Sequence, residues 1–156
     1  MLLLQNAAKF TKESSDLKSI YLTFKRPVLE QSAPVWQSSL SQENISDLER
    51  IQKSAVRLIM GKRHVNYESS LLKLNILKLT ERREDLSLNF AKRTTMNKKI
   101  RHMFPLRKEI RLSKRRKTEK YVVRKARTNR LKNSAIPYLQ NLLNKNHNEN
   151  KLCQPC

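Results

Sequence analysis

The sequence predicts a mainly α-helical protein: a small helical bundle followed by a basic, partly irregular extension. Three observations support this fold class. Apolar residues recur at spacings of three and four through much of the first 90 residues. The 156-residue chain contains 1 Gly, which leaves little material for the tight turns of β-hairpins. Lys and Arg concentrate behind the periodic part, where residues 91–132 hold 18 of them against 2 Asp or Glu.

The first expected helix starts at Ser14, Ser15 or Asp16 and places apolar residues on one face: Leu17, Ile20, Tyr21, Phe24 and Val28. Pro27 lacks a backbone N–H, so it should bend this helix or end it near Arg26. Pro34 should prevent further regular helix and leave Trp36 in an extended or turn segment. We expect Pro27 and Pro34 to form a corner that fixes the helix crossing. Burial of Trp36 in the helical part is favoured over a base-stacking role.

The second expected helix begins at Asn44 as a cap and ends before Gly61, the chain's only glycine. Its apolar stripe consists of Ile45, Leu48, Ile51, Ala55, Leu58 and Ile59. Gly61 falls where a left-handed terminating residue is needed, and we assign it a structural role.

Two further helices are expected before the basic segment. One covers about residues 67–74. The other is capped by Thr80, buries Leu86 and Phe90, and should end by Pro105.

Beyond residue 105 the periodicity is poor until the C-terminal part. The stretch YVVRK, residues 121–125, fits either a short strand or part of a helix. An amphipathic helix follows with Pro137 near its first turn, and the polar residues after Asn144 should be disordered. The predicted organisation is a helical bundle (10–90), a basic extension (91–132), a C-terminal helix (133–144) and a tail (145–156).

The charge distribution indicates a polyanionic partner. The net charge is +21, and residues 1–60 contribute only +2, from 8 Lys or Arg and 6 Asp or Glu. Nucleic acid is the favoured partner and an anionic membrane surface is the second. No apolar run approaches the length of a membrane span, no signal peptide is recognisable, and only 2 Cys occur. We therefore expect an intracellular protein, in the nucleus or the cytoplasm.

The basic run SKRRKTEK, residues 113–120, is typical of a nuclear-import patch, a nucleic-acid contact or a solvated charge run. Cations on both sides of it favour phosphate binding. Tyr121 and Phe104 lie among these charges and are candidates for stacking on a base, although core packing is at least as good an explanation for Phe104. The candidate nucleic-acid-binding residues are Lys98, Lys99, Arg101, Arg107, Lys108, Arg111, Lys114, Arg115, Arg116, Lys117, Arg124, Lys125, Arg127 and Arg130.

No catalytic or metal site is predicted. The 3 Asp residues, Asp16, Asp47 and Asp85, each fall near an expected helix start, where they stabilise the helix dipole. One glycine cannot form a phosphate-binding loop. Cys153 and Cys156 form a CxxC pair with His147 nearby, but three ligands in a polar tail leave a zinc site incomplete. We expect no cofactor, no metal and no small-molecule substrate.

Several spaced motifs resemble the C-terminal part of reverse transcriptases of jockey-like non-LTR retrotransposons. They span about residues 10–144. They are Ile20-Tyr21, Arg26-Pro27-Val28-Leu29, Ala33-Pro34-Val35-Trp36, Leu48-Glu49-Arg50-Ile51-Gln52, Arg57-Leu58-Ile59-Met60-Gly61, Leu79-Thr80-Glu81-Arg82-Arg83, and the closing stretch NSAIPYLQNLLN, residues 133–144. Gln31 departs from this pattern, because a tyrosine is frequent there.

The resemblance implies the helical thumb of an RNA-directed DNA polymerase and the region beyond it. Such a thumb grips the product duplex, and the basic segment would bind template RNA or target DNA. The implied partner is therefore RNA or an RNA/DNA duplex. The palm, with its adjacent aspartates, is absent from this sequence, so the resemblance implies a non-catalytic fragment whose missing polymerase domains would act in trans. Two alternatives remain: a stand-alone basic structural or adaptor protein of the ribosome or chromatin, and an inert transposon relic.

Overall fold

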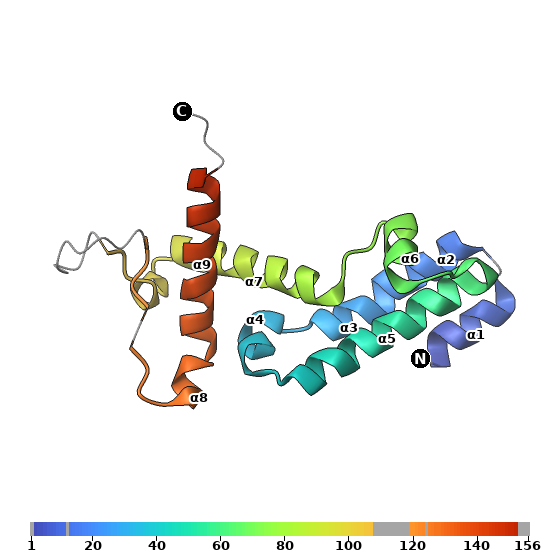
Figure 1. Ribbon diagram of the computed structural model, residues 1–156, viewed down its shortest axis with the longest axis horizontal. Helices are drawn as coiled ribbons and strands as arrows, with labels where there is room; N and C mark the ends of the chain where they lie inside the picture. The colour runs from blue at the N-terminus through green and yellow to red at the C-terminus, as the bar shows by residue number, and fades with distance from the viewer. Residues whose placement is uncertain (1, 12, 108–118, 124, 153–156) are drawn as a thin grey trace. The chain divides into compact units, whose positions relative to one another are not determined.

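The computed structural model describes residues 2–11, 13–107, 119–123 and 125–152, and it is mainly helical, as the sequence predicts (Figure 1). The described residues contain no β-strand, only an isolated antiparallel bridge between Leu106 and Tyr121. The chain divides into two compact units. Unit 1 comprises Met1–Ser32 and Leu40–Arg83, and unit 2 comprises Ala33–Ser39 and Glu84–Cys156. The predicted organisation placed its boundaries elsewhere, after residues 90, 132 and 144.

Unit 1 contains α1 (Leu2–Phe10), α2 (Ser14–Ile20), a π-helical turn η1 (Tyr21–Lys25), α3 (Arg26–Glu30), α5 (Gln42–Met60), the 3₁₀ turn η3 (Gly61–Arg63), α6 (Tyr67–Leu74) and the start of α7 (Leu79–Met96). Unit 2 contains α4 (Ala33–Trp36), the 3₁₀ turn η2 (Gln37–Ser39), the rest of α7, the 3₁₀ turn η4 (Arg101–Met103), α8 (Asn129–Lys132) and α9 (Ala135–Leu152).

The helix that contains Pro27 continues through it by means of a π-helical turn. In this turn the Arg26 N–H donates to the carbonyl of Tyr21, five residues back. An α-helical Pro27 would lack its own hydrogen bond to residue 23 and crowd that carbonyl. The wider turn opens the backbone just before the proline, which is a common place for π-helical geometry. The helix therefore continues after Pro27 through Val28 and Leu29, one of the two outcomes that the sequence allowed.

The segment after α3 differs from the prediction. Gln31 (φ −54°, ψ 125°) followed by Ser32 (φ 55°) has the backbone of a type II turn. Pro34 then lies in the first turn of the short helix α4, where its missing N–H costs nothing, and Trp36 ends that helix rather than lying in an extended segment. Trp36 is half-buried and belongs to unit 2, where α4 contacts α9. The expected burial of Trp36 in the helical front was wrong.

The core of unit 1 forms where α5 packs against α1, α2 and α6 (Figure 1). Its buried residues are Leu4, Leu17, Tyr21, Ala55, Val56, Ile59, Met60, Leu71, Leu74 and Ile76. Helix α1 was not predicted, yet Leu4 is fully buried in this core. The unit therefore starts before residue 10, the first residue of the predicted bundle.

Helix α5 begins earlier than predicted and ends where predicted. Ser41 caps it, because its hydroxyl accepts a hydrogen bond from the Asn44 N–H at 3.2 Å, so Asn44 is not the cap. Gly61 terminates it with φ 51° and ψ −127° and donates its N–H to the Arg57 carbonyl. This is the backbone of the first central position of a type II′ turn, which favours glycine. The helix therefore ends at the predicted glycine with a positive φ, but not with the left-handed helical backbone that the sequence predicted.

A polar network lies inside the apolar core of unit 1. The Tyr21 hydroxyl donates to Gln52 Oε1 at 2.9 Å. Gln52 Nε2 donates to the Tyr67 hydroxyl at 3.1 Å and to the Leu77 carbonyl at 3.0 Å, and the Tyr67 hydroxyl donates to Glu49. Burial raises the pKa of both tyrosine hydroxyls, and the Glu49 carboxylate adds to the effect at Tyr67. The network joins the π-helical turn, α5, α6 and the loop before α7 through one side chain.

Unit 2 is built around α9. Its core consists of Ala91 on α7, Phe104 after η4, and Leu139 and Leu143 on α9. Phe90, expected on the buried side of α7, is instead 46% exposed. Helix α9 continues to Leu152, eight residues beyond the predicted helix end at Asn144, so residues 145–152 are helical and not part of a disordered tail.

Candidate nucleic-acid interface

Two stretches within the basic segment, residues 105–107 and 120–122, are hydrogen-bonded to each other. The Arg107 N–H donates to the Lys120 carbonyl at 3.0 Å, and the Val122 N–H donates to the Pro105 carbonyl at 3.0 Å. Together with the bridge between Leu106 and Tyr121, these bonds form a short antiparallel pairing of residues 105–107 with 120–122. The sequence could not decide between strand and helix for residues 121–125; the described part is neither a regular strand nor a helix.

Two buried amide side chains on α9 hold this pairing. Asn144, 6% exposed, accepts from the Tyr121 N–H at 2.8 Å and donates to the Tyr121 carbonyl at 3.0 Å. Gln140, one helical turn earlier and fully buried, donates to the Met103 carbonyl at 2.8 Å. Both amides therefore lie on the same side of α9. Asn144 binds the pairing itself at Tyr121, and Gln140 binds Met103, two residues before the pairing, so both anchor this part of the chain to the helix.

The aromatic residues of the basic segment contribute mainly to packing. Phe104 is 3% exposed in the core of unit 2, so it is not available to stack on a base. Tyr121 is half-buried against the same core, and Lys120 Nζ lies 5.6 Å from the centre of its ring. The segment is therefore held against the core of unit 2 at Phe104 and Tyr121.

The structure places seven of the fourteen predicted cations. Lys98, Lys99 and Arg101 are exposed in the segment that leads into the pairing, and Arg107 lies in the pairing itself. Exposed cations also follow the pairing toward α8, at Lys125, Arg127 and Arg130. The other predicted residues lie outside the described residues: Lys108, Arg111, Lys114, Arg115, Arg116, Lys117 and Arg124.

Unit 2 carries most of the chain's excess charge. Its sequence ranges hold 20 Lys or Arg against 5 Asp or Glu, a surplus of 15, whereas those of unit 1 hold 14 against 8, a surplus of 6. Arg107 forms an ion pair with Glu119 at 3.7 Å, across the pairing. Four carboxylates besides Glu119 cannot balance the other cations of this unit, so its surface attracts anions.

The three aspartates lie on separate helices. Asp16 accepts a hydrogen bond from the Thr11 hydroxyl at 3.0 Å in the first turn of α2. Asp47 pairs with Arg50 at 3.2 Å, and it lies in the second turn of its helix, as Asp85 does, rather than at the start. Within the described ranges no three His, Cys, Asp or Glu residues gather at a place that could hold a metal ion. Cys153 and Cys156 lie outside those ranges.

Sequence reasoning missed the residues that position the segment. Gln140 and Asn144 occur in a stretch that reads as an amphipathic helix, with leucines at its apolar positions. The available signal was their four-residue spacing in line with Leu139 and Leu143, which places polar and apolar side chains on adjoining parts of one face. That spacing does not reveal which backbone groups the amides bind.

Comparison with known proteins adds no relative. No family model, no curated protein and no solved structure matches this chain. Among the helices in the described part of the chain, none combines the length and the apolar character needed to cross a bilayer.

Proposed function

We propose that this chain is a non-catalytic nucleic-acid-binding protein, and that it derives from the C-terminal part of a retrotransposon RNA-directed DNA polymerase. The observation that carries the binding proposal is the surplus of 15 positive charges in the sequence ranges of unit 2. The resemblance of the sequence motifs supports the origin of the chain. RNA or an RNA/DNA duplex is the expected ligand, and the missing polymerase domains would act in trans.

The binding mode follows from the side chains that face solvent. Lys and Arg bind phosphate oxygens of any sequence, and binding releases the counterions that surround the nucleic acid. We assume about 6 simultaneous phosphate contacts, which gives a slope of about −5 for the logarithm of the association constant against the logarithm of salt concentration on duplex DNA. The slope is smaller on single strands. The hydrogen bonds from α9 fix the backbone around Tyr121 before the nucleic acid binds. Binding therefore loses less conformational entropy, which favours affinity.

The test compares two variants of equal net charge. In the interface variant, Lys98, Lys99 and Lys125 are each replaced by Gln. In the control variant, Lys9, Lys62 and Lys73, exposed residues of unit 1, are replaced by Gln. Fluorescence anisotropy of labelled RNA, RNA/DNA and DNA duplexes over about 50–200 mM salt then measures affinity and slope.

The interface variant should bind every duplex more weakly and lose up to about 3 of the contacts, which lowers the slope to about −3. The control variant should behave like the parent chain. Equal losses in both variants would mean that the chain binds by net charge alone and has no interface in unit 2. Primer extension on an RNA template with Mg²⁺ or Mn²⁺ should show no incorporation, and incorporation above a mock preparation would contradict the non-catalytic part of the proposal.

A further inference from the structure

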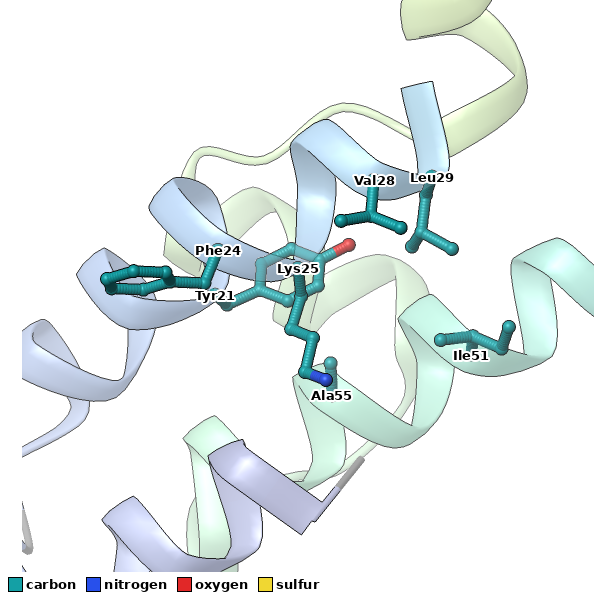
Figure 2. Close-up of a pocket in the computed structure, with 7 residues that line it drawn as sticks. All are labelled: Tyr21, Phe24, Lys25, Val28, Leu29, Ile51 and Ala55. Atoms are coloured by element: carbon teal, nitrogen blue, oxygen red, sulfur yellow. The ribbon is translucent and has the colours of Figure 1, made fainter. Parts of the chain in front are cut away.

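Unit 1 has an apolar groove that the nucleic-acid proposal does not use. It lies between the continuous helix formed by α2, η1 and α3 and the neighbouring α5 (Figure 2). Its volume is about 240 Å³, and the surface that lines it is mostly apolar. The lining residues are Tyr21, Phe24, Lys25, Val28, Leu29, Ile51 and Ala55.

Three apolar side chains that line the groove are exposed to solvent. Phe24 is 58% exposed, Val28 68% and Ile51 39%, and all three line the same depression. Such clusters on a soluble protein commonly mark interaction sites, whereas single exposed apolar residues do not. The floor is rigid, because Tyr21 is fixed to Gln52 by a hydrogen bond of 2.9 Å and Ala55 is 1% exposed.

The local sequence explains why a depression forms here. The π-helical turn before Pro27 changes the direction in which successive side chains leave the helix, so Phe24 and Val28 lie along the rim. Ala55 on α5 contributes only a methyl group to the floor of the groove. A small residue facing a widened turn leaves space that a larger side chain would have filled.

Lys25 is the one charged residue of the groove. Its side chain is half-buried and extends toward α5 in Figure 2. Glu30, the acidic residue nearest in the following helix, is engaged by Arg26 at 2.7 Å and by Arg82 at 3.5 Å. A lysine beside apolar side chains favours an occupant that brings an anionic group with it.

We propose that the groove binds an amphipathic helix of a partner protein, with aliphatic side chains in the depression and an Asp or Glu carboxylate against Lys25. A cavity of about 150 Å³ is known to accommodate a benzene molecule, so the 240 Å³ of this groove suit one or two aliphatic side chains. Helices that dock in this way present anchors at spacings of three and four. The surplus of 6 positive charges in the sequence ranges of unit 1 attracts an acidic segment.

A nucleic-acid strand fits the groove less well. Binding of single strands uses flat aromatic faces and a row of cations that follows the phosphates. Here the groove has a single cation and four aliphatic residues, and of its two aromatic residues only Phe24 is exposed, because Tyr21 is fully buried. This proposal does not depend on the nucleic-acid proposal, because the groove belongs to unit 1 and the proposed interface belongs to unit 2.

The experiment selects peptides from a displayed library on the full chain. The library contains sequences of about 16 residues, long enough to form a marginal helix, with randomised positions on one face. Any acidic peptide is attracted by the net charge of +21, so selected peptides are compared on two variants with the same added charge. Val28→Asp places a carboxylate in the groove, and Val65→Asp places one at a residue that is 79% exposed outside it.

The selected peptides should combine Leu, Ile or Met at helical spacing with Asp or Glu. Their affinity should fall at least about tenfold for Val28→Asp and change little for Val65→Asp, because truncating or charging a central anchor typically costs more than about 1.4 kcal/mol. Circular dichroism of both variants checks that they remain folded. Equal affinity for the two variants, or selection of peptides without aliphatic anchors, would overturn the proposal.

Charge reversal tests the role of Lys25. Lys25→Glu should weaken the acidic peptides about three- to fivefold, as expected for a partly exposed ion pair, and a Glu-to-Lys change in the peptide should restore the affinity. Lys73→Glu, at an exposed lysine of α6, is the matched control and should show no such rescue. If the Glu-to-Lys change in the peptide fails to restore the affinity for Lys25→Glu, the contact between Lys25 and the peptide carboxylate is refuted.

Other occupants would give distinct results. In one such result, analytical ultracentrifugation detects self-association of the parent chain that is lost in Val28→Asp. This result would mean that the groove binds a second copy of this chain and not a partner helix. An RNA oligonucleotide whose affinity falls in Val28→Asp but not in Val65→Asp would assign the groove to nucleic acid. Either result would overturn the proposal.

Discussion

Replacing Gln52 by Leu tests whether the polar network holds unit 1 together. Gln52 is fully buried, and its side chain binds Tyr21, Tyr67 and Leu77 at 2.9, 3.1 and 3.0 Å. Leucine is similar in size and helix propensity, so the change removes hydrogen bonds with little loss of volume. The Tyr67 hydroxyl keeps Glu49 as a partner, whereas the Tyr21 hydroxyl and the Leu77 carbonyl lose Gln52.

The magnitude follows from the two groups that lose their hydrogen bond. Each buried polar group left without a partner costs about 1–3 kcal/mol. The two together give about 2–6 kcal/mol, from which the greater hydrophobicity of leucine subtracts about 1 kcal/mol. Unit 1 spans 76 residues, in stretches of 32 and 44, for which the total stability is about 4–11 kcal/mol. The variant should therefore lose a large part of the stability of unit 1, or all of it.

Urea unfolding of the full chain provides the measurement. Circular dichroism at 222 nm follows the helices of both units, and fluorescence of Trp36, the only tryptophan, follows unit 2. The circular dichroism transition should shift to lower urea. Gln42→Leu, at an exposed position at the start of the same helix, is the matched control and should change stability by less than about 0.5 kcal/mol. A Gln52→Leu variant as stable as this control would refute the reasoning.

Three further predictions concern single features. Asn144→Ala removes both side-chain bonds to the Tyr121 backbone, so unit 2 should lose about 2–4 kcal/mol and the Tyr121 amide should exchange hydrogen faster; unchanged exchange would contradict the anchoring role. Gly61→Ala should cost about 1–3 kcal/mol in urea unfolding through backbone strain alone, because an added Cβ meets no atom within 4 Å, and a cost below about 0.5 kcal/mol would be inconsistent with that strain. Burial raises the pKa of Tyr21 and Tyr67, so their contribution to stability is complete below the ordinary pKa of about 10 and is lost as pH rises above it, because the unfolded chain ionises first. The free energy of unfolding should decline above pH 10 with a smaller slope in Tyr67→Phe, and equal slopes would argue against the effect.

The sequence predicted the elements that local signals define. The helix at residues 67–74 was located to the residue, and the end of α5 at Gly61 was found because only a glycine suits that backbone. Pro27 was correctly identified as a perturbation of its helix. What the sequence could not show is that a π-helical turn, rather than a break, accommodates the proline, since no pattern of residues distinguishes these two outcomes.

The errors have physical causes as well. Helix α1 has three consecutive leucines, which carry no period of three or four, so its burial through Leu4 depends on contacts with α5 that lie far away in sequence. The predicted end of helix α9 was Asn144, because the apolar pattern stops there. It continues to Leu152, and the sequence from 145 to 152 contains no Gly or Pro that would end it.

For the candidate site, the sequence identified the charged residues but not the contacts that hold the basic segment in place. Composition alone located the cations of the basic segment. The pairing of residues 105–107 with 120–122, and the amide side chains that anchor it, result from tertiary contacts between positions 23 and 37 residues apart. Likewise, Trp36 was assigned to the helices nearest in sequence, whereas its unit is completed by α9.

The division of the chain has a consequence during synthesis on the ribosome. Residues 33–39 belong to the second unit although unit 1 surrounds them in sequence, and their partner α9 starts only at Ala135. At about 5–20 residues per second, translation separates Ala33 from Ala135 by roughly 5–20 s. Within that time Leu40–Arg83 is complete and unit 1 can fold. The segment that carries Trp36 cannot reach its final contacts with α9 during this interval, so unit 2 is completed only after unit 1 has had time to fold.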